Sequence, residues 1–126
     1  MERGLIKTSM GYIHYRATGQ GKPIILLHPL PRSSVMFIEL MEALRERRRV
    51  FAPDYPSYGM SDHVSGHPTI GDYARVVTEL MDALGEESSP ESYKGLFTFY
   101  GFTSFRNAMV TKEHRKRQER KPWQSP

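Results

Sequence analysis

A histidine that ends a short apolar run is the first candidate for chemistry in this chain. The run Pro23–Leu27 is too short for a helix and lacks polar alternation, which is typical of a strand buried on both faces of a parallel sheet. It stops at His28, and two prolines and two serines follow before Val35. A buried strand followed by an abrupt turn places that turn at the carboxyl edge of a sheet, where open α/β sheets bind ligands.

A second group of side chains with possible chemistry lies in a polar loop and comprises Asp62, His63 and His67. Loop residues without helical spacing or supporting hydrogen bonds are weak indicators of a metal site, so we expect no bound metal. We expect no other cofactor either. The chain has no cysteine, which excludes disulfides and cysteine–metal centres.

The elements around the apolar run alternate between strand and helix patterns. Leu5–Thr8 and Tyr12–Ala17, joined at Gly11, predict an antiparallel ribbon at the edge of a sheet. After the run we expect a helix capped by Ser33 or Ser34, and then a strand at Val50–Pro53. A second helix should follow, in which Thr69 and Asp72 form a capping box and Gly85 ends the helix.

The two expected helices have apolar stripes. The first stripe contains Phe37, Leu40, Met41 and Leu44, with Arg47–Arg49 at the helix C-terminus, and the second contains Ile70, Tyr73, Val77, Leu80 and Leu84. This order predicts an α/β fold with a mostly parallel sheet, an antiparallel N-terminal ribbon and helices on both faces.

The pattern changes after Gly85, so we divide the chain into residues 1–85 and residues 86–126. The second part reads as a linker, one strand at Leu96–Tyr100 and a basic tail. Lys and Arg outnumber Asp and Glu by ten to nine in the first part and by eight to five in the second. The near-neutral first part argues against a domain built wholly around nucleic acid, and the charged tail is expected to be disordered or a frayed helix.

The first part resembles the opening half of an α/β-hydrolase-fold protein, over about residues 4 to 85. The matching pieces, in order, are Gly11–Tyr15, Pro23–His28, Ala52–Asp62 and Ile70–Ala74 leading to Gly85. As a set, with their order and spacing, these pieces are specific, whereas each alone is weak. The resemblance implies a mainly structural role for the Asp54–Asp62 loop.

The resemblance also implies roles for the turn after the apolar run. In this family a His-Gly-x-Pro segment supplies half of an oxyanion hole through a backbone N–H. The matching residues are His28, Pro29, Leu30 and Pro31, so Leu30 would donate the N–H and His28 would support the loop. Pro29 departs from the family glycine and fixes its own φ, but the Leu30 donor remains.

The nucleophile that such a family member needs has no clear counterpart. The chain contains no Gly-x-Ser-x-Gly segment, and the nearest piece is Gly101–Phe105. In it Ser104 stands one position late, and Phe105 replaces the small residue that the tight strand–helix turn requires. Ser104 is therefore a remnant of a nucleophile site at best, and His114 lies in the charged tail, so no catalytic histidine is expected.

Three interpretations of function stay open. The chain is an α/β-hydrolase relative that is truncated and inactive as it stands and would act on a small molecule with an ester, epoxide or related bond if completed. Alternatively it is a non-catalytic binding module using the half-pocket or the basic tail, or a frameshifted product without function. We expect no nucleic-acid or membrane partner and, lacking a long apolar stretch, a cytoplasmic location; oligomeric state is not predicted.

Overall fold

In the computed structural model, which describes residues 1–85 and 96–98, the strands form one sheet in the order β1-β2-β4-β3-β5. The strands are β1 (Glu2–Thr8), β2 (Gly11–Gly19), β3 (Lys22–Leu27), β4 (Arg48–Pro53) and β5 (Leu96–Thr98). Two helices cover the sheet, α1 (Ile38–Leu44) and α2 (Ile70–Ala83), and the 3-10 helix η1 (Ser34–Phe37) leads into α1.

The N-terminal ribbon is confirmed and is longer than predicted. Strands β1 and β2 pair antiparallel from Glu2 opposite Ala17 to Thr8 opposite Gly11. Strand β2 also pairs antiparallel with β4, whereas β3 pairs parallel with both β4 and β5. The described sheet is therefore half parallel and half antiparallel. This corrects the prediction of a mostly parallel sheet, because the ribbon is hydrogen-bonded to β4.

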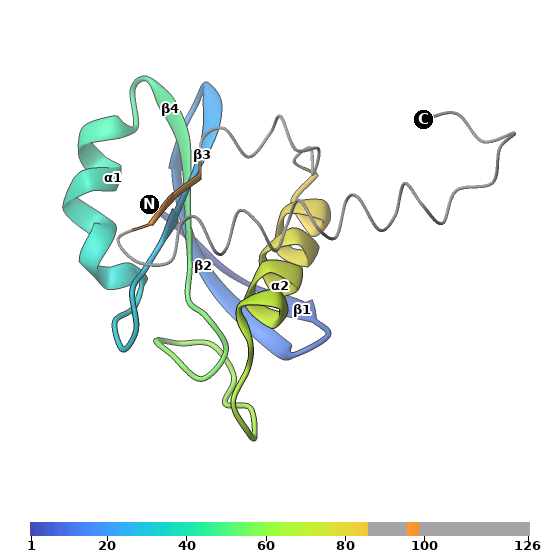
Figure 1. Cartoon of the computed structure of the whole chain (residues 1–126). Helices are drawn as coiled ribbons and strands as arrows, with labels where there is room; N and C mark the ends of the chain where they lie inside the picture. Colours follow the sequence, from blue (N-terminus) through green and yellow to red (C-terminus); the bar gives the residue numbers. More distant parts are fainter. Residues whose placement is uncertain (86–95, 99–126) are drawn as a thin grey trace, which may run out of the picture.

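Strand β3 is buried as its apolar sequence predicted, most completely at its C-terminal end. Ile25, Leu26 and Leu27 are buried, whereas Pro23 and Ile24 are partly exposed. Ile25 and Leu27 pack in a hydrophobic cluster with α2, and Leu26 packs in another with residues of η1 and α1. Because successive strand side chains point to opposite faces, the two helices lie on either side of the sheet (Figure 1).

The helix after β3 begins as a 3-10 turn and is shorter than the sequence predicted. The Ser33 hydroxyl accepts a hydrogen bond from Val35 N, which caps η1. Met41 is buried, but Leu40 is 39% exposed, so its expected place in the apolar stripe was wrong. Seven residues of helix bury only a narrow stripe, and Leu40 lies beside it.

The arginine run was also misplaced. Helix α1 ends at Leu44, so Arg48 and Arg49 open strand β4 instead of ending a helix. The Arg48 guanidinium donates hydrogen bonds to the carbonyl oxygens of Lys22 and Pro23. Arg48 therefore holds the amino ends of β3 and β4 together.

Helix α2 begins and ends where the sequence indicated. Thr69 and Asp72 form the complete capping box, and Gly85 follows the helix with a φ of +80°, which suits glycine. Tyr73, Val77 and Leu80 are buried as expected, but Ile70 is 40% exposed, so it is not part of the buried stripe. Ile70 occupies the first turn, at the edge of the packed face.

Strand β5 pairs with β3 and places Leu96 opposite Ile25. The first three residues of the predicted strand, Leu96–Thr98, therefore form a strand beside β3, and residues 99 and 100 lie outside the described residues. The predicted linker and basic tail lie outside the described residues, and the division of the chain at residue 85 stays a prediction. No helix among the described residues is long and apolar enough to span a membrane.

Candidate functional site

His28 lies at the carboxyl end of β3 and connects the turn after this strand to the loop after β4. Its side chain is buried, its Nδ1 lies 3.0 Å from the Pro29 carbonyl oxygen, and its Nε2 accepts a hydrogen bond from Tyr55 N at 3.1 Å. The ring therefore donates at Nδ1 and accepts at Nε2. Burial lowers the pKa of His28 below its usual value, which agrees with this uncharged form.

The aromatic contacts of His28 extend to α2. Its ring lies 4.4 Å from the Tyr55 ring, which in turn stacks on Tyr73 of α2 at 4.6 Å. Tyr58 adds an edge contact to the histidine at 5.9 Å. His28 is thus held by rings of the loop after β4, and Tyr55 connects this packing to α2.

The turn after His28 presents the backbone of Leu30. Arg32 N donates to the Pro29 carbonyl oxygen at 2.8 Å, which closes the turn, and the Leu30–Pro31 peptide bond is cis. The Leu30 side chain is 46% exposed. Within the described part of the chain, the Leu30 N–H has no hydrogen-bond partner. None of the described residues therefore occupies the backbone N–H that the resemblance assigns to the oxyanion hole.

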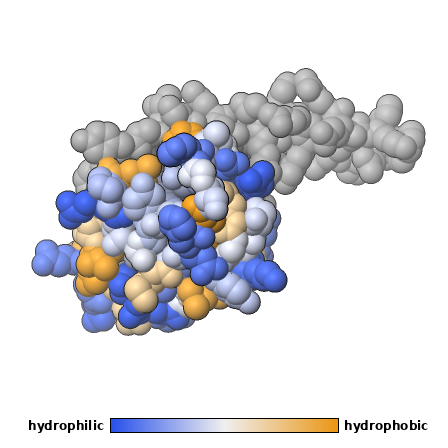
Figure 2. Space-filling view, turned by 90° about the horizontal axis from the view of Figure 1, so that it is seen from below, coloured by the Kyte–Doolittle hydropathy of each residue, from blue (hydrophilic) through white to orange (hydrophobic). Residues whose placement is uncertain are grey.

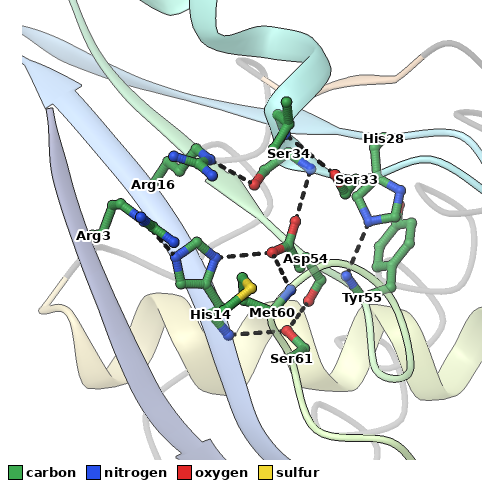
Figure 3. A network of polar contacts seen from close by, with 11 residues as sticks. Arg3, His14, Arg16, His28, Ser33, Ser34, Asp54, Tyr55, Met60 and Ser61 are labelled. Atoms are coloured by element: carbon green, nitrogen blue, oxygen red, sulfur yellow. Dashed lines mark hydrogen bonds and ion pairs between the residues drawn. The ribbon is translucent and has the colours of Figure 1, made fainter.

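Asp54 is the residue that sequence reasoning missed. Its carboxylate is buried just after β4 and accepts hydrogen bonds from Ser34 N at 2.7 Å, Met60 N at 3.0 Å and His14 Nδ1 at 2.8 Å (Figure 3). Burial alone would raise the pKa of Asp54, but the backbone donors at Met60 and Ser34 outweigh it and hold the pKa below its usual value. Asp54 is therefore a buried anion with partners on three segments.

His14 completes this network from strand β2. Its Nε2 accepts a hydrogen bond from Arg3 Nε at 3.1 Å, and its backbone N–H donates to Ser61 Oγ at 2.9 Å. Ser61 in turn donates to the Asp54 carbonyl oxygen at 2.7 Å. A sequence signal existed for these residues, because His14, Asp54 and Ser61 all lie in the pieces that carried the resemblance, but that signal did not show that they meet.

The Asp54–Asp62 loop is shaped by this carboxylate. Gly59 has a φ of +53°, and a Cβ there would collide with the Asp54 carboxylate. Ser57, which stands where the family has a glycine, also adopts a positive φ of 72°. A non-glycine residue in this region costs about 1 kcal/mol or more, so the loop around it must hold it in place. The Ser57 backbone N–H does donate to the Asp62 carbonyl oxygen at 2.8 Å.

A pocket of about 380 Å³ opens beside the turn. It lies between the two loops that Asp54 connects, and its lining residues are Pro31, Arg32, Ser33, Val35, Met36 and Gly59. Seen from below, the described surface shows hydrophobic residues scattered among hydrophilic ones, not gathered in one large patch (Figure 2).

The remaining sequence candidates do not converge on this site. The Asp62 carboxylate accepts a hydrogen bond from Tyr12 N at 2.8 Å, which is a structural use, and no group of three possible metal ligands occurs in residues 1–85 and 96–98. Ser104 and His114 lie outside the described residues. The proposed roles of His28 and Leu30 and the predicted nucleophile remnant at Ser104 therefore stay predictions.

Comparison with protein families gives a match over residues 22–88 to the model described as alpha/beta hydrolase fold. Haloalkane dehalogenase 2 of Mycobacterium tuberculosis is 43% identical over 79 residues, which cover 62% of this chain and 28% of the dehalogenase. The chain therefore spans less than a third of the length of this curated relative.

Solved structures similar to this chain are also hydrolases, and the chain again covers only part of each. An N-acyl homoserine lactonase variant complexed with N-hexanoyl homoserine lactone superposes with a TM-score of 0.65 at 30% identity, over 68% of this chain and 34% of the lactonase. An epoxide hydrolase from an endophytic Streptomyces superposes with a TM-score of 0.64 at 28% identity, over 68% of this chain and 27% of the hydrolase. The likeness thus covers about a third or less of the length of each of these two hydrolases.

Proposed function

The chain belongs to the α/β hydrolase fold family, and on that premise we propose that it carries the oxyanion-hole half of a hydrolase for a small-molecule substrate. The relatives named above are a dehalogenase, a lactonase and an epoxide hydrolase. Their range supports a carbon–halogen, ester-type or epoxide bond as the target, without selecting one. We also keep the cytoplasm as the proposed location.

The observation that carries this proposal is the backbone N–H of Leu30, just after β3, which has no hydrogen-bond partner among residues 1–85 and 96–98. An oxyanion hole needs a donor held in place before charge develops on the substrate oxygen, because it then costs no reorganisation during the reaction. His28 supports such rigidity, since it bonds to the Pro29 carbonyl oxygen on one side and to Tyr55 N on the other. Leu30 is thus the proposed donor and His28 its support.

A loop graft tests the donor. Replacing the matching loop of the N-acyl homoserine lactonase by residues 28–34 of this chain should keep lactone hydrolysis, because Leu30 offers its N–H despite Pro29. Exchanging Leu30 in the graft for its α-hydroxy-acid analogue replaces the N–H by an ester oxygen, which cannot donate, and should lower kcat about 10²–10³-fold. A graft with Leu30→Ala keeps the N–H and serves as the control. Equal kcat with and without the N–H would refute the proposed role.

We further propose that this 126-residue chain does not hydrolyse substrate by itself. The sequence lacks Gly-x-Ser-x-Gly, and Ser104 is followed by Phe105 where the tight turn needs a small residue. The purified chain should therefore show no turnover of a short-chain p-nitrophenyl ester above the buffer rate. Hydrolysis that disappears in Ser104→Ala would contradict this and would make Ser104 the nucleophile.

The divergence after Gly85 supports a truncated or frameshifted reading frame as its origin. Translation of the other two frames of the gene beyond codon 85 tests this: a strand followed by Gly-x-Ser-x-Gly is expected in one of them, and its absence from both would reject the idea. A binding module is the second candidate function, and the pocket beside Arg32 is the observation that favours it.

A further inference from the structure

The pocket between the two loops has walls that are fixed before any ligand arrives. Ser34 N and Met60 N both donate to the buried Asp54 carboxylate, and these residues directly adjoin the lining residues Ser33, Val35 and Gly59. The volume of about 380 Å³ is at the lower end of the range for small-molecule sites, about 300–1,000 Å³. The pocket therefore suits a ligand of modest size.

Arg32 contributes a positive charge to the lining of this pocket. The Arg32 side chain is exposed, and its guanidinium makes no ion pair or hydrogen bond with any residue of the described ranges. The backbone N–H of Arg32 donates to the Pro29 carbonyl oxygen, so the backbone of Arg32 is held in place by this turn. The Asp54 carboxylate behind the pocket walls is buried and already accepts hydrogen bonds from three donors. A single guanidinium matches the two oxygens of one carboxylate.

The rest of the lining is largely apolar. Pro31, Val35 and Met36 contribute aliphatic surface, and Val35 is 57% exposed. Met60, next to the lining residue Gly59, is 63% exposed. Aliphatic side chains left uncovered around a pocket gain free energy when an apolar chain covers them. A ligand with one charged end and a short alkyl chain would use both features.

We propose that this pocket binds a small monocarboxylate with a short alkyl chain, and that Arg32 binds its carboxylate. Leu30 does not line the pocket. The inference therefore goes beyond the proposed hydrolytic role, because it requires binding without turnover. Failure of the loop graft would leave this site standing, and failure of carboxylate binding would leave the proposed oxyanion hole standing.

The test is a titration of the full 126-residue chain with hexanoate, followed by amide chemical shifts and by calorimetry. Saturable binding should shift the amides of Arg32, Ser33, Val35 and Met36. Hexanamide, which has the same chain without the charge, and acetate, which has the charge without the chain, should each bind at least about tenfold more weakly.

Two variants separate the site from general attraction to a basic protein. Arg32→Gln should weaken hexanoate binding at least about tenfold, whereas Arg47→Gln, which removes another exposed arginine without a described partner, should leave it unchanged. Both should melt like the parent chain. Equal losses in the two variants, equal binding of hexanamide, preferential binding of inorganic phosphate or an absence of saturable shifts would each overturn the proposal.

Discussion

Asp54 accepts hydrogen bonds from three segments that are far apart in sequence, namely β2, the start of η1 and the loop after β4. A buried carboxylate is costly unless its oxygens are matched by donors, and here each oxygen has at least one. The same carboxylate forces glycine at position 59. Asp54 therefore determines how both walls of the candidate site are held, although it does not face the pocket itself.

The exchange Asp54→Asn tests this role. The amide keeps the size of the side chain but removes the charge and turns one acceptor into a donor, which would face an N–H group. We expect the free energy of unfolding to fall by about 3 kcal/mol, measured by urea denaturation. Asp82→Asn, at an exposed position of α2, should change it by no more than about 0.5 kcal/mol. Similar values for both variants would contradict the assignment.

The lowered pKa of His28 predicts how the stability of the chain depends on pH. Its pKa is lowered in the folded chain, so the unfolded chain binds more protons between the folded pKa and the unfolded value of about 6.5. Stability should therefore fall as the pH drops below about 6.5, with a contribution from His28 of at most about 1.4 kcal/mol per pH unit.

The measurement is urea denaturation between pH 5 and 7 for the parent chain and two variants. His28→Gln should flatten the pH dependence, because it removes the group whose pKa differs between the two states. His63→Gln, which changes an exposed histidine, should leave the slope as it is. An unchanged slope in His28→Gln would show that His28 is not the group responsible.

At the scale of single elements, features that depend on residues within one turn were predicted correctly, and features that depend on distant residues were not. The capping box at Thr69 and the stop at Gly85 depend on residues within one turn, so the sequence was sufficient to locate them. The exposure of Leu40 and Ile70 depends on how far a neighbouring element extends, which helical periodicity does not contain. The Asp54 network likewise joins residues 20 and 40 positions away, and no pattern in the sequence marks such a meeting.

The capping box at the start of α2 gives a prediction at this scale. Thr69→Ala removes the hydroxyl that accepts from Asp72 N and should lower the free energy of unfolding by about 1 kcal/mol in thermal or urea denaturation. Thr69→Ser keeps a hydroxyl and should retain most of the stability. An alanine variant as stable as the parent chain would mean that packing alone holds the first turn.

At the scale of the whole molecule, strand β3 is the centre of the argument, because His28, Leu30 and the pocket all follow from its C-terminal end. It lies between β4 and β5. Its position in the sheet therefore depends on a strand from the part of the chain that the family match does not reach, since that match ends at residue 88. The family pattern predicted the strand itself, but it did not identify which residues of this chain would pair with its free side.

Two shortened chains test whether β5 protects β3. Residues 1–98 keep β5, and residues 1–95 lack it, so the pair differs by one three-residue strand. Without β5 the backbone groups along one side of β3 lose their described partners, and an open edge beside buried apolar residues is prone to pair with another chain. We expect the 1–95 chain to self-associate in sedimentation experiments and to lose hydrogen-exchange protection at Ile25–Leu27. The 1–98 chain should sediment like the full chain and keep the same protection at these residues. If both chains remain monomeric with equal protection, β5 does not cover that edge in solution, and the parallel pairing of Ile25 with Leu96 must be abandoned together with the support that it gives the site.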